Sequence, residues 1–239
     1  MTESGKDMPF TITDKEILDL QKQFPSALNY LTTITVIERE FGKVGNTVLA
    51  GQLGVSKPAA NQAIGRLKKL GLAEQNPYGG INLTLEGKRF AFAVLRRHYL
   101  IEHLLISQLS YPWDKSDDEA QRLQASLSEE FTEYLYEFFN RPETCPHGNP
   151  FPGSAIEQEL LNARRLSGAS LNEPLVLIRI TELGETVVGL LPFCYENALL
   201  PGTPLTVSAR EETTLILMTD RGTVSLPAAF AEYLCCKDA

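Results

Sequence analysis

Residues 47–71, TVLAGQLGVSKPAANQAIGRLKKLG, decide the fold of this chain, because they spell two short helices joined by a tight turn. Gly-Val-Ser at 54–56 supplies the turn. Ser56 can accept a hydrogen bond from a free backbone N–H of the second helix, and Pro58 sits in the first turn, where a missing N–H costs little. Apolar side chains then recur every three or four residues and form a buried stripe. The stretch therefore predicts a helix-turn-helix.

The outward face of the second helix carries amide and cationic side chains, which are groups that read base edges and hold phosphates in a major groove. A basic helical hairpin also occurs in proteins that bind no DNA, so the motif by itself is a weak signal. The predicted DNA-binding residues on this face are Lys57, Asn61, Gln62 and Arg66.

The residues that follow strengthen this prediction. Residues 72–75 and 81–84 alternate apolar with other side chains, and they flank the turn signal Asn-Pro-Tyr-Gly-Gly at 76–80. Helix, turn, helix and hairpin together predict a winged helix-turn-helix.

Charge is distributed unevenly along the chain. The net charge of the 239 residues is −8, yet residues 43–97 contain nine Lys and Arg against two Glu. A local positive balance on an acidic body is what a DNA footprint would give. No apolar run approaches membrane-spanning length and the N-terminus lacks a signal-peptide pattern, so we expect a soluble, cytoplasmic protein with no membrane partner. The four cysteines lack CxxC spacing, and we expect free thiols.

The remaining patterns predict an α+β fold of two or three units, as the length also suggests. Thr-Asp-Lys-Glu at 13–16 starts a short amphipathic helix, whose role the sequence leaves open. A long helix, 85–109, is apolar on more than one face in its second half, which a partner subunit would cover. Further helices are expected at 26–41, 114–125, 128–139 and 155–161, and strands of a small β-barrel at 175–180, 186–191, 204–209, 214–219 and 223–226.

Three blocks of sequence, taken in order, carry a family resemblance: LGVSKPAANQAIGRLKKLGL, INLTLEGKRFAFAVLRRHYLIEHLL, and CPHGNPFPG at 145–153. With these blocks the chain resembles the diphtheria-toxin-repressor family of metal-dependent transcriptional repressors. The resemblance implies a winged helix-turn-helix, a helical dimerisation domain, and a C-terminal SH3-like β-barrel similar to the small iron-transport accessory proteins. The expected limits are an N-terminal extension at 1–25, the DNA-binding domain at 26–92, the dimerisation domain at 93–140, a linker at 141–170 and the SH3-like domain at 171–239.

The resemblance also implies how the chain binds DNA. Gln62 matches the recognition-helix glutamine that approaches a base edge, while Ser56 and Pro58 match residues at the groove surface. A glutamine can bond an adenine edge through two hydrogen bonds. We therefore expect a homodimer on a palindromic operator of double-stranded DNA.

The family's principal metal site is expected to be lost. Its positions correspond here to residues that offer no charge to a divalent cation: Asn29, Gln121, Gln124 and Ala125. Because Mn²⁺ and Fe²⁺ at such sites need carboxylate, thiolate or imidazole ligands, we expect that no cofactor is required.

The family's second, ancillary metal site is partly kept. His98 and Glu102 stand at i and i+4 on one helix face, and Asp117 falls where the family has another ligand. These three residues could bind Mn, Fe or Zn weakly, or His98 and Glu102 could be a hydrogen-bonded pair without a cation. The further ligands expected from the C-terminal domain look absent near 190–193, and we expect His103 and His147 to be ordinary surface or loop histidines.

Two classes of function remain. The first is a homodimeric, sequence-specific DNA-binding regulator, a repressor by resemblance, which is independent of metal or answers another signal. That signal could be a small molecule in the vacated site, a thiol event, or a metal at the ancillary site. The cysteines in question, Cys194, Cys235 and Cys236, are more simply explained as small buried apolar side chains. The second class is a dimeric interaction module that binds no DNA. No nucleophile, base and orienting residue are visible together, and the sequence supplies no phosphate loop, so we do not expect an enzyme.

Overall fold

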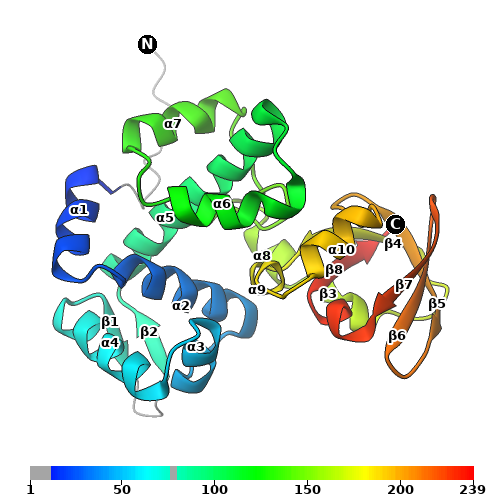
Figure 1. The fold of residues 1–239 in the computed structure, drawn as a ribbon, viewed down its shortest axis with the longest axis horizontal. Coiled ribbons are helices and arrows are strands. Elements are labelled where there is room, and N and C mark those ends of the chain that lie inside the picture. Colours follow the sequence, from blue (N-terminus) through cyan, green and yellow to red (C-terminus); the bar gives the residue numbers. More distant parts are fainter. Residues whose placement is uncertain (1–11, 76–79) are drawn as a thin grey trace. The chain divides into compact units, whose positions relative to one another are not determined.

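A computed structural model describes residues 12–75 and 80–239 (Figure 1). Tertiary contacts divide the chain into two compact units. The N-terminal unit comprises Met1–His98 and Arg122–Phe138, and the C-terminal unit comprises Tyr99–Gln121 and Phe139–Ala239. This division follows contacts within the chain, and the five expected domain limits stay a prediction.

The N-terminal unit contains the expected helix-turn-helix. Ser56 accepts a hydrogen bond from Ala59 N at 3.3 Å and so caps the second helix, with Pro58 in its first turn. In chain order the unit is built from α1 (Asp14–Gln23), α2 (Ala27–Phe41), α3 (Asn46–Gln52), α4 (Lys57–Lys69), β1 (Ala73–Gln75), β2 (Ile81–Leu83), most of α5 (Leu85–His103), and α7 (Glu129–Phe138).

The predicted wing is confirmed as a hairpin. β1 pairs antiparallel with β2, and Glu74 lies opposite Asn82. The turn signal at 76–79 lies outside the described residues. Thr84 donates to Gly71 O at 2.7 Å and accepts from Gly87 N at 3.1 Å, so one hydroxyl joins the end of α4 to the start of α5. The wing is thereby fixed to the helices on both sides of it.

The C-terminal unit is built around a six-stranded antiparallel sheet of order β3-β8-β4-β5-β6-β7. Leu177, Val207 and Leu217 are fully buried in its core, as alternation along each strand requires. The strands are β3 (Arg164–Arg165), β4 (Leu175–Ile180), β5 (Pro204–Arg210), β6 (Thr214–Thr219), β7 (Gly222–Pro227) and β8 (Leu234–Asp238). The helical segments are a π-helical turn (Leu104–Gln108), 3-10 turns (Trp113–Lys115, Leu166–Gly168 and Ala228–Glu232), the start of α6 (Ser116–Leu123), α8 (Glu157–Leu161), α9 (Glu182–Glu185) and α10 (Leu190–Glu196).

The α+β fold class and four of the five expected strands are confirmed, but the strand expected at 186–191 is wrong. The chain turns into α9 directly after β4, because Thr181 accepts from Gly184 N at 3.0 Å and caps that helix. Leu190 and Cys194 are then buried at helical spacing on α10. An apolar segment of this length is compatible with a short strand or a short helix, and tertiary packing favours the helix here.

Two further expectations concern membrane-spanning segments and the redox state of the cysteines. Of the helices in residues 12–75 and 80–239, none is long and apolar enough to cross a membrane. The four cysteines are free, as predicted, and all four are buried.

Candidate metal centre and nucleic-acid interface

Four side chains with cation-binding atoms converge inside the C-terminal unit. Glu102 comes from the last turn of α5, Cys145 and His147 from the loop after Phe139, and Glu185 from the end of α9. The possible ligand atoms of these four residues all lie within 4.8 Å of one another. Glu102 and His147 are fully buried, and the Glu185 side chain is 4% exposed. The cluster is therefore shielded from water.

The loop that presents two of these residues is fixed by its own backbone. Cys145 N donates to Asn149 O at 2.8 Å, and Ile180 N of β4 donates to His147 O at 2.9 Å. Gly148 has a φ of +90°, and a Cβ there would lie 2.2 Å from Ile178 O. Only glycine allows this approach, so the tight contact with β4 sets the positions of Cys145 and His147.

His147 lies between acidic side chains. Its Nδ1 is 3.0 Å from Glu102 Oε1 and 3.5 Å from Glu185 Oε1, and its Nε2 is 3.2 Å from Trp113 O. Burial lowers the pKa of His147, but the charge of Glu102 and the hydrogen bond to it raise the pKa above its usual value. The imidazole is therefore in an environment that favours positive charge.

The acidic members of the cluster repel one another. Burial, followed by the charges of Glu102 and Asp117, raises the pKa of Glu185 well above that of an ordinary carboxyl group. Burial, followed by the charges of Glu102 and Glu185, also raises the pKa of the Cys145 thiol well above its usual value. Buried like charges are costly unless a cation compensates them. The residues fit a divalent transition metal, since carboxylate, thiol and imidazole together suit Fe²⁺, Mn²⁺ or Zn²⁺.

Further buried polar residues hold the Glu185 carboxylate of α9 in place. The Arg179 side chain of β4 is fully buried and donates to Asn149 Oδ1 at 2.7 Å and to Leu160 O at 3.0 Å. Asn149 in turn donates through Nδ2 to Glu185 Oε1. Such outer contacts orient metal ligands and fix their protonation.

Of the predicted ancillary residues, the structure brings Glu102 and Asp117 together with Glu185. His98 lies one turn before Glu102 on the continuous helix α5, so both side chains share a helix face. His98 and Glu102 are buried.

One expectation about this centre is wrong. His147 is fully buried in the cluster, so it is not the ordinary surface or loop histidine that we expected. The sequence did not single out Glu185, which joins the cluster from the end of α9, just before the 190–193 region where we expected no further ligands. Its side chain is 4% exposed. His103 is partly buried and contacts Thr144 O at 2.8 Å, next to the cluster's loop.

The residues at the expected principal site do not form a comparable cluster of acidic, thiol or imidazole groups. Asn29 is exposed on α2 and Gln121 is exposed on α6. Gln124 and Ala125 follow the end of α6. The loss of this site for metal stays a prediction.

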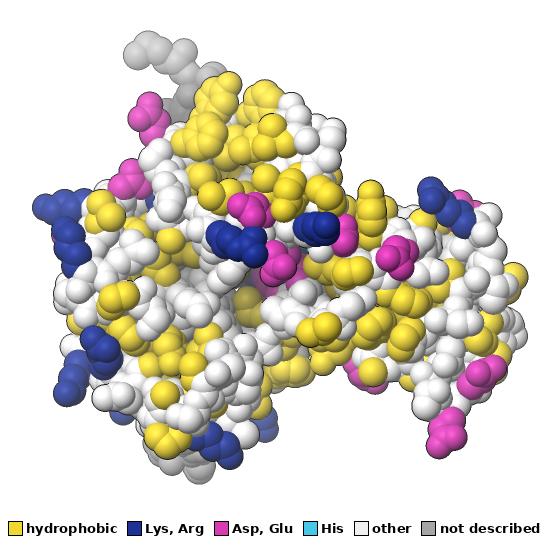
Figure 2. Space-filling model, in the orientation of Figure 1, with side chains coloured by type: hydrophobic (Ala, Val, Ile, Leu, Met, Phe, Trp, Pro, Cys, Tyr) yellow, Lys and Arg dark blue, Asp and Glu magenta, His cyan; other side chains and the backbone are white. Residues whose placement is uncertain are grey.

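The six predicted DNA-binding residues are all exposed at the start or on the outer face of α4. Figure 2 shows Lys and Arg side chains along the lower left of the view, over this helix. Asn61 Oδ1 accepts a hydrogen bond from Asn46 Nδ2 of α3. Gln62 is exposed next to it on the same helix.

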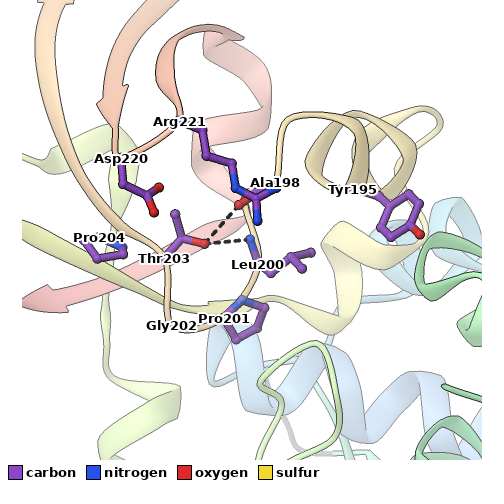
Figure 3. Close-up of a pocket in the computed structure, with 9 residues that line it drawn as sticks. All are labelled: Tyr195, Ala198, Leu200, Pro201, Gly202, Thr203, Pro204, Asp220 and Arg221. Atoms are coloured by element: carbon purple, nitrogen blue, oxygen red, sulfur yellow. Dashed lines mark hydrogen bonds between the residues drawn. The ribbon is translucent and has the colours of Figure 1, made fainter. Parts of the chain in front are cut away.

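A separate hollow of about 530 Å³ opens on the C-terminal unit beside Tyr195, Pro201 and Arg221 (Figure 3). Thr203 turns toward the main chain there, accepting from Leu200 N at 3.1 Å and donating to Ala198 O at 3.0 Å. Its hydroxyl is thus used within the fold, and the hollow presents no buried charged group to a ligand.

A winged helix-turn-helix followed by helices and a C-terminal sheet defines a DNA-binding transcriptional regulator, a class distinct from enzymes. Matches to two protein-family models identify the family of regulators to which the chain belongs. Residues 24–81 match the model for the iron dependent repressor, N-terminal DNA binding domain, and residues 84–153 match the model for the iron dependent repressor, metal binding and dimerisation domain. These segments together span more than half of the chain, and the chain belongs to the iron-dependent repressor family.

Relatives and solved structures agree with this assignment. The iron-dependent repressor IdeR of Mycobacterium leprae is 28% identical over 212 residues, which cover 84% of this chain and 92% of the relative. IdeR of Mycobacterium tuberculosis is 35% identical over 124 residues, 52% of this chain and 54% of the relative. A solved manganese-dependent transcriptional repressor in complex with manganese is 29% identical, covers 89% of this chain and all of that chain, and superposes with a TM-score of 0.76. The predicted family resemblance is confirmed.

Proposed function

We propose that this chain is a dimeric repressor whose binding to an operator responds to a divalent transition metal held by Glu102, Cys145, His147 and Glu185. One observation carries the proposal: the ligand atoms of these four buried side chains lie within 4.8 Å of one another. The expectation that no metal is required rested on the amide and alanine side chains at another site. The buried cluster supports the metal-responsive alternative instead.

The chain's own residues define what a metal would do here. Glu102 belongs to α5, whereas Cys145 and His147 belong to a loop held on β4, and Glu185 belongs to α9. A bound metal supplies positive charge that offsets the repulsion between the two carboxylates. Binding of these side chains to one cation would hold the last turn of α5 against the 145–149 loop. Asp117, and His98 on the same helix face as Glu102, would contribute further ligands.

A thiol-based signal is less well supported. Burial raises the pKa of Cys194 to about 12, and burial followed by the charge of Cys235 raises the pKa of Cys236 to about 12. A thiol reacts as its thiolate, so groups with such pKa values are poor redox sensors at neutral pH. The explanation of these residues as buried apolar side chains is the simpler one.

In the proposed DNA complex, Gln62 and Asn61 read base edges from α4. Lys57 and Arg66 would hold phosphates, and Ser56 and Pro58 would lie at the groove surface. The exposure of all six residues and the match of residues 24–81 to a DNA-binding domain support these roles. Phosphate contacts would make binding strongly salt-dependent.

A second copy of the chain would cover the exposed aromatic face of α7. Phe131, Tyr134 and Phe138 lie on one side of this helix, and the neighbouring ring centroids are 6.2 Å apart. They are 42%, 62% and 52% exposed, and Figure 2 shows the apolar surface at the top of the view, over α7. Tyr134→Glu should give a monomer by light scattering, whereas Met218→Glu, at an exposed position on strand β6 of the C-terminal unit, should leave a dimer. A dimeric Tyr134 variant would contradict this interface.

The metal response is tested by titrating Mn²⁺, Fe²⁺ and Zn²⁺ while measuring affinity for an operator selected from random DNA, with and without chelator. Metal should strengthen operator binding of the unmodified protein at least tenfold. Glu102→Gln keeps the shape of the side chain but removes its charge, and it should abolish the stimulation. Glu159→Gln changes an exposed carboxylate on α8 and serves as the matched control. Equal DNA affinity with metal and with chelator would refute the proposal.

A further inference from the structure

Helix α1 precedes both segments that match the family models, which begin at residue 24. It is a well-formed element of the N-terminal unit: Thr13 and Glu16 form a reciprocal capping box, and Ile17 and Leu20 are buried. Figure 1 shows α1 at the left edge of this unit, between α7 and α4. The residues at its two ends contact those two helices.

The first end of α1 is tied to α7 through a buried arginine. Arg97 of α5 is 1% exposed, and its Nη2 lies 3.2 Å from Asp14 Oδ1 and 3.2 Å from Glu129 Oε2. Asp14 Oδ1 also accepts from the backbone N of Glu129 at 2.9 Å, in the first turn of α7. One carboxylate therefore neutralises a buried cation and satisfies an N–H group at the start of α7. Without Asp14, Arg97 would lose one of its two anionic partners.

The other end of α1 is tied to the recognition helix. Arg66 of α4 donates to Gln23 O at 3.3 Å, and its guanidinium lies 4.3 Å from the centre of the Phe24 ring. Phe24 is buried and closes α1, because its backbone N–H bonds to Leu20 O. The contact between Arg66 and the aromatic face is favourable in its own right.

We propose that α1 is a brace that fixes the orientation of the recognition helix α4 relative to α7, with Asp14 and Phe24 as positioning residues at its two ends. This inference rests on the proposed roles of α4 in reading DNA and of α7 in the dimer. A dimer binds a palindrome only if its two recognition helices have the correct spacing. A link between the DNA-reading helix and the dimer-forming helix would help to set that spacing.

A positioning role of α1 and a purely stabilising role of α1 predict different effects of substitutions on DNA binding. Asp14→Asn breaks one end and Phe24→Leu breaks the other, while each keeps much of the side chain's shape. If both ends act through one rigid link, either substitution should weaken binding to the full palindrome by about tenfold. The double variant should bind the full palindrome at most about twofold more weakly than either single variant does. Independent effects at opposite ends of a ten-residue helix would instead add.

The experiment measures affinity of the full-length protein for the selected palindrome and for a single half-site, together with melting temperature and oligomeric state. Brace variants should bind the half-site within twofold of the unmodified protein and should remain dimeric. Asp19→Asn changes a carboxylate that pairs with Lys22 of the same helix at 3.1 Å, and this matched control should bind both DNAs normally. Equal losses on half-site and palindrome, additive losses in the double variant, or unchanged binding would each overturn the brace. A monomeric unmodified protein, or one without operator binding, would instead refute the proposed function.

Discussion

Gly148 offers a sharp test of how the proposed metal centre is held. The residue belongs to the loop of the proposed ligands and lies against β4, with a φ of +90°. A Cβ at this position would lie 2.2 Å from Ile178 O and 2.8 Å from Arg179 Cα. Both neighbours are backbone atoms of a central strand and cannot rotate away. Gly148→Ala therefore requires the 145–149 loop to move by roughly 1 Å to reach ordinary contact distance.

The cost has two parts. A non-glycine residue in the left-handed region costs about 1–2 kcal/mol, and displacement of a packed loop adds about 1–3 kcal/mol. A total of about 3 kcal/mol corresponds to a fall in melting temperature of roughly 6–12 °C for a domain of this size. Since Cys145 and His147 precede Gly148 in the same loop, the same movement should weaken metal binding by about 10- to 100-fold.

The matched control is Gly168→Ala, where a Cβ would meet nothing within 4 Å. Metal affinity is measured by calorimetry with Mn²⁺ and by competition with a Zn²⁺ indicator, and stability is measured in the presence of chelator. The control should leave both quantities near those of the unmodified protein. If Gly148→Ala binds metal normally despite a lower melting temperature, the loop geometry does not set the site, and the reasoning is refuted.

Three further outcomes are expected. Arg179→Met removes the donor to Asn149 and should lower metal affinity about 10- to 100-fold; unchanged calorimetric affinity would show that this outer contact is dispensable. Because the pKa values of Glu185 and Cys145 are raised, protons compete with the metal, and metal affinity should fall about tenfold or more for each unit of decreasing pH near neutrality; a pH-independent affinity would argue against these ligands. Gln62→Ala should weaken binding to the operator by about 1–3 kcal/mol and leave binding to random DNA nearly unchanged, as a gel-shift comparison of the two DNAs would measure; equal losses on both would contradict its role in reading bases.

Local elements were predictable because their signals are short-range. The caps formed by Thr13, Ser56, Thr84 and Ser128 each depend on a residue three positions away, and all four hydrogen bonds are present. The helix-turn-helix and wing follow from such signals and from apolar spacing. The expected strand at 186–191 failed because apolar spacing there does not distinguish a short strand from a short helix.

The amino-acid sequence was enough to predict a helix-turn-helix, the side chains exposed on its second helix, and the family of metal-dependent repressors. It was also enough to show that the residues expected at the principal metal site lack charge. Where the candidate ligands converge could be seen only in the folded chain. The sequence placed Glu102 in a possible ancillary site, but His147 and Glu185 are far from it in the chain and each by itself resembles an ordinary polar residue. They form a centre because a glycine contact places the 145–149 loop on β4 and a capped turn after β4 points Glu185 inward. Long-range packing of this kind leaves no periodic trace in a sequence.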